Sequence, residues 1–429
     1  MANLYDGEIV KQPFSLKIFL SYFPKMAWFI LLAALLLKFT VPEVESLFNL
    51  IITFIVLYLF FKLKTIIHEC GHLVAGYWAG AIPKRMILGT GHEVYRTEWN
   101  GVKIVLKSIP IGGRAIALFN ELPFIRLRFA FFILGGVLFN ILAALIFYFL
   151  FGYDSSFLLA AHGIDLASCF IFANLLGVTN LIPFYTSYYG TSMPTDGLSL
   201  LQIVFGSYKK NFQNLKHSED YFQSFECFEK RDYDKAYDLY QTLHEKIPAE
   251  LTALSMMATI LIKRCQPNEA LTLLATLEGR IESKELKKHK GIIYNNIAWT
   301  YLLKDNIETA YDYASKAIKE MPKNKVVGGT YGSILIEAGK VDIGMQWVAF
   351  NVDMKHPNDT TLAASIYMML GSHLKMDFVA RDRHLTYVQK NENMLEKDSA
   401  LMWKRNLEKI NKETSPTIGG LDHSSTRLK

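Results

Sequence analysis

Long apolar runs fill the first half of the chain and limit what that half can fold into. A helix needs about 20 mainly apolar residues to cross the hydrocarbon core of a bilayer. Hydrophobic residues make up 51% of the 429 residues, and nearly all the long apolar runs precede residue 208. We predict a polytopic transmembrane helical bundle over residues 1–208. Its expected elements are spans at about 24–41, 47–80, 125–151 and 157–182 and a short apolar helix at 198–205.

The Lys and Arg residues favour one orientation of these spans, because positively charged loops tend to stay in the cytoplasm. The turns at 43–46 and 152–156 contain acidic residues and no Lys or Arg. Most basic residues of this half lie in the N-terminal segment and in 81–124, and two more, Lys209 and Lys210, follow directly after residue 208. We therefore predict a multi-pass integral membrane protein with a cytoplasmic N-terminus and a cytoplasmic C-terminal domain. The first apolar run lacks a convincing small-residue cleavage site and is interpreted as a span rather than a signal peptide.

Charge and cysteine content narrow the possible partners. The net charge is +6, and the basic residues are scattered among acidic ones without a sustained stripe, which argues against nucleic acid. The four cysteines show no paired spacing, so no disulfides are expected.

A β-hairpin is expected between the second and third spans, at about 86–113. Asn100-Gly101 is the dipeptide that a two-residue type I′ turn favours, since both of its central residues need positive φ. Strand-like sequence flanks it on both sides, at 93–99 and 102–109. The hairpin would lie at the cytoplasmic face or dip between helices.

The second half, 209–413, contains a repeat. Ala236, Ala270, Ala310 and Gly344 fall in register with spacings of 34, 40 and 34 residues, and 34 is the period of the tetratricopeptide helix-turn-helix. Further positions agree with that pattern over 219–357, so a soluble α-solenoid is expected, with another helical pair to about 390. An irregular helical bundle is the alternative. The extra residues around 281–290 would form a longer loop, and 414–429 has the composition of a disordered tail.

The run His68-Glu69-Cys70-Gly71-His72 lies inside the second predicted span. Residues four apart share one face of a helix, so His68 and His72 can direct two imidazoles at one metal ion. In the His-Glu-x-x-His arrangement, Glu69 can take a proton from a metal-bound water. Ionisable groups within a span are costly unless they line a cavity or bind something. The alternative is that this stretch lies at the membrane interface, with its polar side chains wetted.

A catalytic zinc site needs three protein ligands and one open position. Asp196 is the leading candidate for the third ligand because it follows the helix-breaking stretch Asn180–Pro183 and precedes a short apolar helix. Asp196 could also serve as the N-cap of that helix, and both roles are compatible.

The chain resembles the site-2 protease family of intramembrane zinc metalloproteases. Four pieces carry the resemblance in order: the His68–His72 motif, a hairpin ending at Ile109–Gly113, Gly135–Asn140 in the next span, and Asn180–Pro183 with a later Asp196-Gly197. The resemblance implies one Zn²⁺ held by His68, His72 and Asp196, with Glu69 as the general base. It also implies Asn140 and Asn180 near the substrate, and a hairpin, including Gly112 and Gly113, that presents the substrate as an added strand.

The chain departs from the family pattern at two points. Val137 stands where the family usually has Pro, and twelve residues, Phe184 to Thr195, separate Pro183 from Asp196 where the family has a short spacer.

The resulting hypothesis is an intramembrane endopeptidase that cuts a membrane protein or peptide within or beside the lipid bilayer. The repeats would recruit the substrate or an adaptor protein, or restrain access to the site. The alternatives are a catalytically silent membrane scaffold that acts through its repeats and, as a more distant one, a metal transporter.

Overall fold

The computed structural model describes Lys38 and residues 47–120, 122–159, 164–188, 191–206, 215–248, 251–283, 286 and 289–414. The chain divides into two compact units, Met1–Gln223 and Ser224–Lys429, which are described separately below. Apart from Lys38, the expected span at 24–41 lies outside the described residues. Apart from Thr414, the expected tail at 414–429 does as well.

Among the described residues of the first unit, two helices are long and apolar enough to cross a bilayer: α2 (Leu47–Trp78) and α3 (Ile125–Phe151). They pack closely where Gly71 faces Gly135, since a Cβ on Gly135 would overlap Ala75 and the Gly71 backbone. Small residues allow two helix backbones to approach in this way. The two helices occupy the residue ranges of the second and third predicted spans; that they cross a membrane stays a prediction.

The expected fourth span is wrong as a single helix. The described residues of 157–182 form a short 3₁₀ helix, η1 (Phe157–Leu159), then α4 (Leu166–Leu175) and a second 3₁₀ helix, η2 (Leu176–Leu181). Asp165 caps the start of α4 by accepting a hydrogen bond from the Ser168 backbone N–H, as aspartate commonly does at helix N-termini. Apolar composition predicts burial in lipid or protein, but it does not show where a helix is interrupted.

The expected hairpin is present and longer than predicted. It comprises β1 (Ile82–Trp99) and β2 (Val102–Leu118), and Asn100 and Gly101 both have positive φ at the turn. The strands bend back on themselves, so that residues 85–88 of β1 have Cα partners both in 103–106 and in 113–116 of β2. Positive φ at Gly112 marks one of these bends, a conformation that glycine adopts without steric cost.

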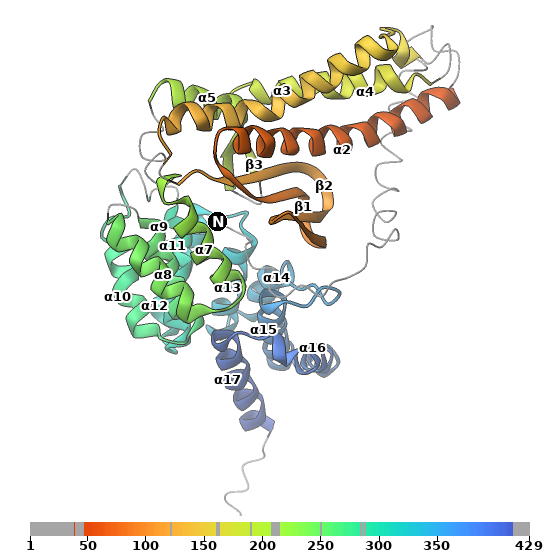
Figure 1. The fold of residues 1–429 in the computed structure, drawn as a ribbon. Helices are drawn as coiled ribbons and strands as arrows, with labels where there is room; N and C mark the ends of the chain where they lie inside the picture. Colours follow the sequence, from red (N-terminus) through yellow and green to blue (C-terminus); the bar gives the residue numbers. More distant parts are fainter. Residues whose placement is uncertain are drawn as a thin grey trace, which may run out of the picture. The chain divides into compact units, whose positions relative to one another are not determined.

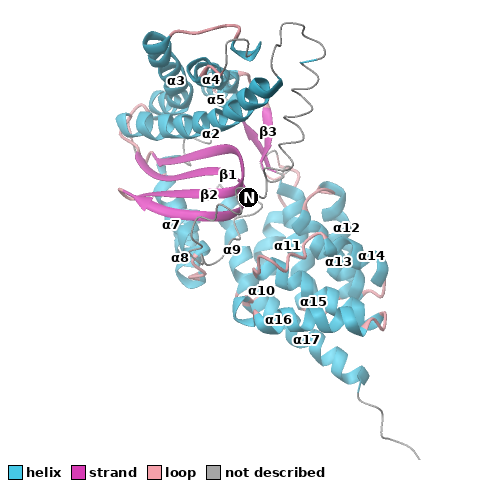
Figure 2. Cartoon of the chain, turned by 90° about the vertical axis from the view of Figure 1, so that its right-hand side faces the viewer, coloured by secondary structure: helices cyan, strands magenta, loops and turns pink. Residues whose placement is uncertain are grey.

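Helix α2 lies between this sheet on one side and α3 and α4 on the other (Figures 1 and 2). A second small hairpin, β3 (Tyr185–Tyr188) and β4 (Thr191–Pro194), was not expected from the sequence. It precedes α5 (Asp196–Val204), which packs against α3 and η2. The short apolar helix expected at 198–205 thus begins two residues earlier.

The second unit is helical in its described residues. Its helices follow one another in pairs joined by short turns, and within four of these pairs the two helices contact each other directly. After α7 (Ser218–Glu229) and α8 (Tyr233–Lys246), the pairs are α9 (Leu251–Lys263) with α10 (Pro267–Glu278), α11 (Lys290–Leu303) with α12 (Ile307–Glu320), α13 (Lys325–Glu337) with α14 (Val341–Ala349), and α15 (Asp359–Leu374) with α16 (Phe378–Lys390).

The turns of these pairs share one backbone feature. A single residue with positive φ occurs just before α8, α10, α12, α14 and α16: Arg231, Cys265, Asp305, Gly339 and Met376. Such a residue ends one helix and lets the chain reverse.

The residues that define the sequence repeat occupy equivalent positions in these helices. Ala236, Ala270, Ala310 and Gly344 are each the fourth residue of their helix, and all four are buried. Small side chains at these positions permit close packing of the two helices of a pair. The repeat therefore has a structural counterpart, while its identity as a tetratricopeptide solenoid remains a prediction.

The last helix, α17 (Lys397–Thr414), contacts the first helices of several pairs, α9, α11 and α15. Its Asp398 pairs with Lys263 of α9, with 3.1 Å between Nζ and Oδ2. Its Arg405 pairs with Glu337 of α13 at 2.8 Å. Helix α17 therefore covers a surface formed by the first helices of the pairs.

Candidate metal centre

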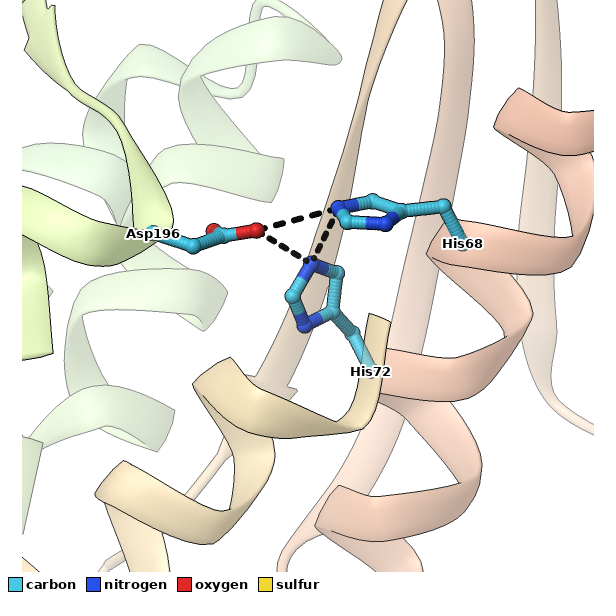
Figure 3. A group of neighbouring side chains, drawn as sticks. All are labelled: His68, His72 and Asp196. Atoms are coloured by element: carbon cyan, nitrogen blue, oxygen red, sulfur yellow. Dashed lines mark hydrogen bonds and ion pairs between the residues drawn. The ribbon is translucent and has the colours of Figure 1, made fainter. Parts of the chain in front are cut away.

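Two turns of α2 and the start of α5 bring three potential metal ligands together (Figure 3). The Nε2 atoms of His68 and His72 lie 3.2 Å apart, and Asp196 Oδ2 lies 3.0 Å from the first and 3.6 Å from the second. Both histidines are buried, and Asp196 is partly buried. The three side chains come from positions 128 residues apart at most, and they meet because α5 packs beside the helices that flank α2.

The donor set suits a zinc ion. His72 Nδ1 donates to the Phe132 carbonyl oxygen at 2.8 Å, which leaves the lone pair of its neutral ring on Nε2, directed at His68 Nε2 and the Asp196 carboxylate. Lone pairs and a carboxylate that converge in a buried site call for a cation. Tetrahedral zinc, with bonds of about 2.0–2.1 Å, separates its ligand atoms by about 3.3 Å, close to the three distances observed.

Gly136 of α3 provides the space for the two imidazoles. A Cβ at this position would lie 2.6 Å from His72 Nε2 and 2.7 Å from His68 Nε2. Any larger residue would therefore push the ligands out of place. The sequence motif Gly135–Asn140 includes this residue, but the sequence alone does not show that Gly136 makes room for the two imidazoles.

Asn140, which is fully buried, contacts the opposite edge of the His68 ring. Its amide nitrogen lies 3.1 Å from His68 Nδ1, and its Oδ1 has no hydrogen-bond partner among the described residues. A half-turn of the amide would bring Oδ1 onto the Nδ1–H that a metal-bound histidine carries. Gly177 of η2 makes room for this amide, because a Cβ there would overlap it.

Asn180 reaches the other nitrogen of the same ring, with Nδ2 3.0 Å from His68 Nε2. That nitrogen also faces Asp196. The two asparagines expected near the substrate are therefore both at the site, but on different sides of His68. Asn180 lies on the ligand-facing side, and Asn140 lies behind the ring.

Glu69 is buried between α2 and the sheet. The Ala115 backbone N–H of β2 donates a hydrogen bond to its carboxylate. Gly113 lies directly against the same side chain, since a Cβ there would be 2.6 Å from Glu69 Oε1. Gly112, by contrast, has open space where a Cβ would be. Of the two glycines expected to contact substrate, the structure thus places Gly113 beside Glu69.

A second acidic group in the described chain, Asp359, Glu396 and Asp398, has metal-like spacing. Lys263 Nζ lies 3.1–3.3 Å from all three carboxylates, so an internal cation already occupies the position between them.

Comparison with known proteins agrees with this geometry. The model of peptidase family M50 matches residues 52–307, more than half of the chain. A comparison with curated proteins found no match. Among solved structures, one described as "Crystal structure of MamA" is similar to 44% of this chain over 95% of its own length, at 17% identity and a TM-score of 0.27, too low to support an argument. The chain belongs to peptidase family M50, the membrane-associated zinc metallopeptidases of the site-2 protease family, and is a metalloendopeptidase.

Proposed function

We propose that this chain is an intramembrane endopeptidase that hydrolyses a peptide bond in a membrane-embedded or membrane-adjacent segment of a protein or peptide. The observation that carries the proposal is the convergence of His68 Nε2, His72 Nε2 and Asp196 Oδ2 within 3.0–3.6 Å of one another on α2 and α5. One zinc ion bound there would polarise the scissile carbonyl and make the attacking water acidic enough to lose a proton near neutral pH.

Glu69 is the proposed general base. It follows His68 directly on α2 and is buried, so its carboxylate is held near the metal ligands and away from bulk water. The carboxylate takes a proton from the attacking water and passes it to the leaving amide nitrogen. The hydrogen bond from the Ala115 N–H fixes the orientation of the carboxylate.

The substrate is proposed to add to β2 as an extended strand. Ala115 of β2 has Met86 of β1 as its Cα partner on one edge, and no described strand pairs with its other edge. The Ala115 N–H points to Glu69, which places the carboxylate along that second edge. A peptide bound there would be extended and exposed to attack beside Glu69, whereas helical peptide bonds are already hydrogen-bonded.

The two asparagines have separate proposed roles. Asn180 Nδ2 lies on the ligand-facing side of His68, where an amide N–H can stabilise the oxygen of the reacting carbonyl. Asn140 contacts the far edge of the ring, so its proposed role is to orient His68 and not to contact the substrate.

The membrane topology is also part of the proposal. Helices α2 and α3 would cross the bilayer, with the N-terminus and the helical second unit in the cytoplasm, as the distribution of Lys and Arg predicts. The helix pairs support a tetratricopeptide-like domain that recruits a substrate or adaptor protein. Because α17 covers α9, α11 and α15, we propose that recruitment uses the other faces of these pairs.

The experiment is to purify the protein in detergent, measure bound zinc and compare cleavage of membrane protein substrates by the wild type and Glu69→Gln. The wild type should contain zinc and cleave, and Glu69→Gln should retain zinc and lose cleavage. Equal cleavage by both forms would contradict the role of Glu69. A zinc-loaded wild type that cleaves no membrane protein tested would favour the scaffold alternative.

A further inference from the structure

The hairpin β3–β4 interrupts the stretch that joins Asn180 to Asp196. Its Cα partners run from Tyr185 with Pro194 to Tyr188 with Thr191. At the open end, the Thr195 backbone N–H donates to the Phe184 carbonyl oxygen at 3.0 Å. The two ends of the insertion therefore lie side by side.

One side chain closes the base of this hairpin. The Thr195 hydroxyl donates to the Ile182 carbonyl oxygen at 2.8 Å and accepts from the Phe184 N–H at 3.2 Å. It also accepts from the Leu198 N–H at 3.4 Å in the first turn of α5. A single oxygen thus ties the chain before the hairpin to the helix after it.

The third metal-ligand candidate, Asp196, lies directly beside the base of the hairpin. Asp196 follows Thr195 and is the first residue of α5. The next residue, Gly197, lies so close to the Leu181 carbonyl that no Cβ would fit. These contacts at the base of the hairpin hold the two sides of the insertion together. Asn180 on one side and Asp196 on the other each approach His68 Nε2 to 3.0 Å. The closed base of the hairpin therefore keeps Asn180 and Asp196 close together despite the twelve inserted residues between Pro183 and Asp196.

We propose that Thr195 is a positioning residue that holds Asp196 in the metal centre, and that the hairpin beyond Thr186 and Met193 is dispensable for metal binding. The role of Thr195 rests on the proposed zinc site. Groups that orient metal ligands typically change metal affinity about 10–100-fold when they are removed. The three hydrogen bonds need only the hydroxyl, so serine should replace threonine, whereas valine, of the same shape, should not.

The test uses the intact protein in detergent and measures Zn²⁺ affinity by competition with a chelator. Thr195→Val and Thr195→Ala should each lower the affinity about 10–100-fold, while Thr195→Ser should keep the wild-type value. In a further variant, Asn-Gly replaces residues 187–192, because this turn can join the Cα partners Thr186 and Met193. That variant should also bind zinc as the wild type does. Circular dichroism and size exclusion report the fold of each form.

Three results would contradict the proposal for Thr195 and the hairpin. Wild-type affinity in both Thr195→Val and Thr195→Ala would overturn the positioning role, as would loss of the folded state in both, which would make Thr195 a folding residue. Weak binding by the shortened hairpin would overturn its dispensability. A wild type that binds no zinc would instead refute the proposed function, so the two failures are distinguishable.

Discussion

Replacement of Gly136 by alanine should disable the metal centre while the helix that carries it remains intact. The added methyl would lie 2.6 Å from His72 Nε2 and 2.7 Å from His68 Nε2, whereas ordinary contacts begin at 3.4 Å. The two rings must therefore retreat by about 0.7–0.8 Å, and metal–ligand distances tolerate deviations of only about 0.2 Å. Because alanine favours a helix more than glycine does, α3 itself should not be weakened.

The expected loss of Zn²⁺ affinity is at least about 100-fold, equivalent to about 2.7 kcal/mol. The measurement is a chelator competition with purified protein in detergent, with zinc per chain determined independently. Leu138→Ala is the matched control, because Leu138 lies two residues away on α3 and its side chain is 46% exposed. Wild-type zinc affinity in Gly136→Ala would refute the placement of the two imidazoles against α3.

Three further predictions concern Asn140, Lys263 and His384. Asn140→Leu should weaken Zn²⁺ binding about 10–100-fold without removing a ligand, and unchanged affinity would argue against the contact with His68 Nδ1. Lys263→Met leaves three carboxylates, two of them on buried residues, without their shared cation and should destabilise the second unit by about 3–5 kcal/mol in denaturant unfolding, unlike the exposed-site control Lys319→Met. Burial lowers the pKa of His384 to about 4, so its contribution of about 3 kcal/mol is present above pH 6.5 and lost as the pH falls towards 4. Hydrogen exchange in α16 should rise over this range in the wild type and change less in His384→Phe.

The sequence predicted the parts of the site that depend on local spacing. Residues four apart share a helix face, and His68 and His72 lie on one face of α2 as predicted. The Asn100-Gly101 turn was predicted for the same kind of reason, since its two residues need positive φ. The approach of Asp196 followed from the order of the family's motifs, because spacing along the chain says nothing about two groups 128 residues apart.

The parts that were not predicted depend on how elements meet in space. Gly136 matters because α3 crosses α2 at the histidines. The sequence of neither helix alone predicts where the two helices cross. The break before α4 depends on a cap at Asp165 within an otherwise apolar run. The hairpin β3–β4 lies in a Tyr- and Ser-rich insertion that shows no strand alternation, and its closure at Thr195 depends on two chain ends that meet only in the folded protein.

X-ray absorption at the zinc edge of the purified wild-type protein tests the metal centre most directly. We expect one zinc ion per chain with four nitrogen or oxygen ligands at about 2.0–2.1 Å, two of them with the scattering pattern of imidazole. Asp196→Ala should alter this ligand set and lower the zinc content. A sulfur ligand at about 2.3 Å, which would implicate Cys70, or a wild type with no stoichiometric zinc would contradict the assignment of His68, His72 and Asp196.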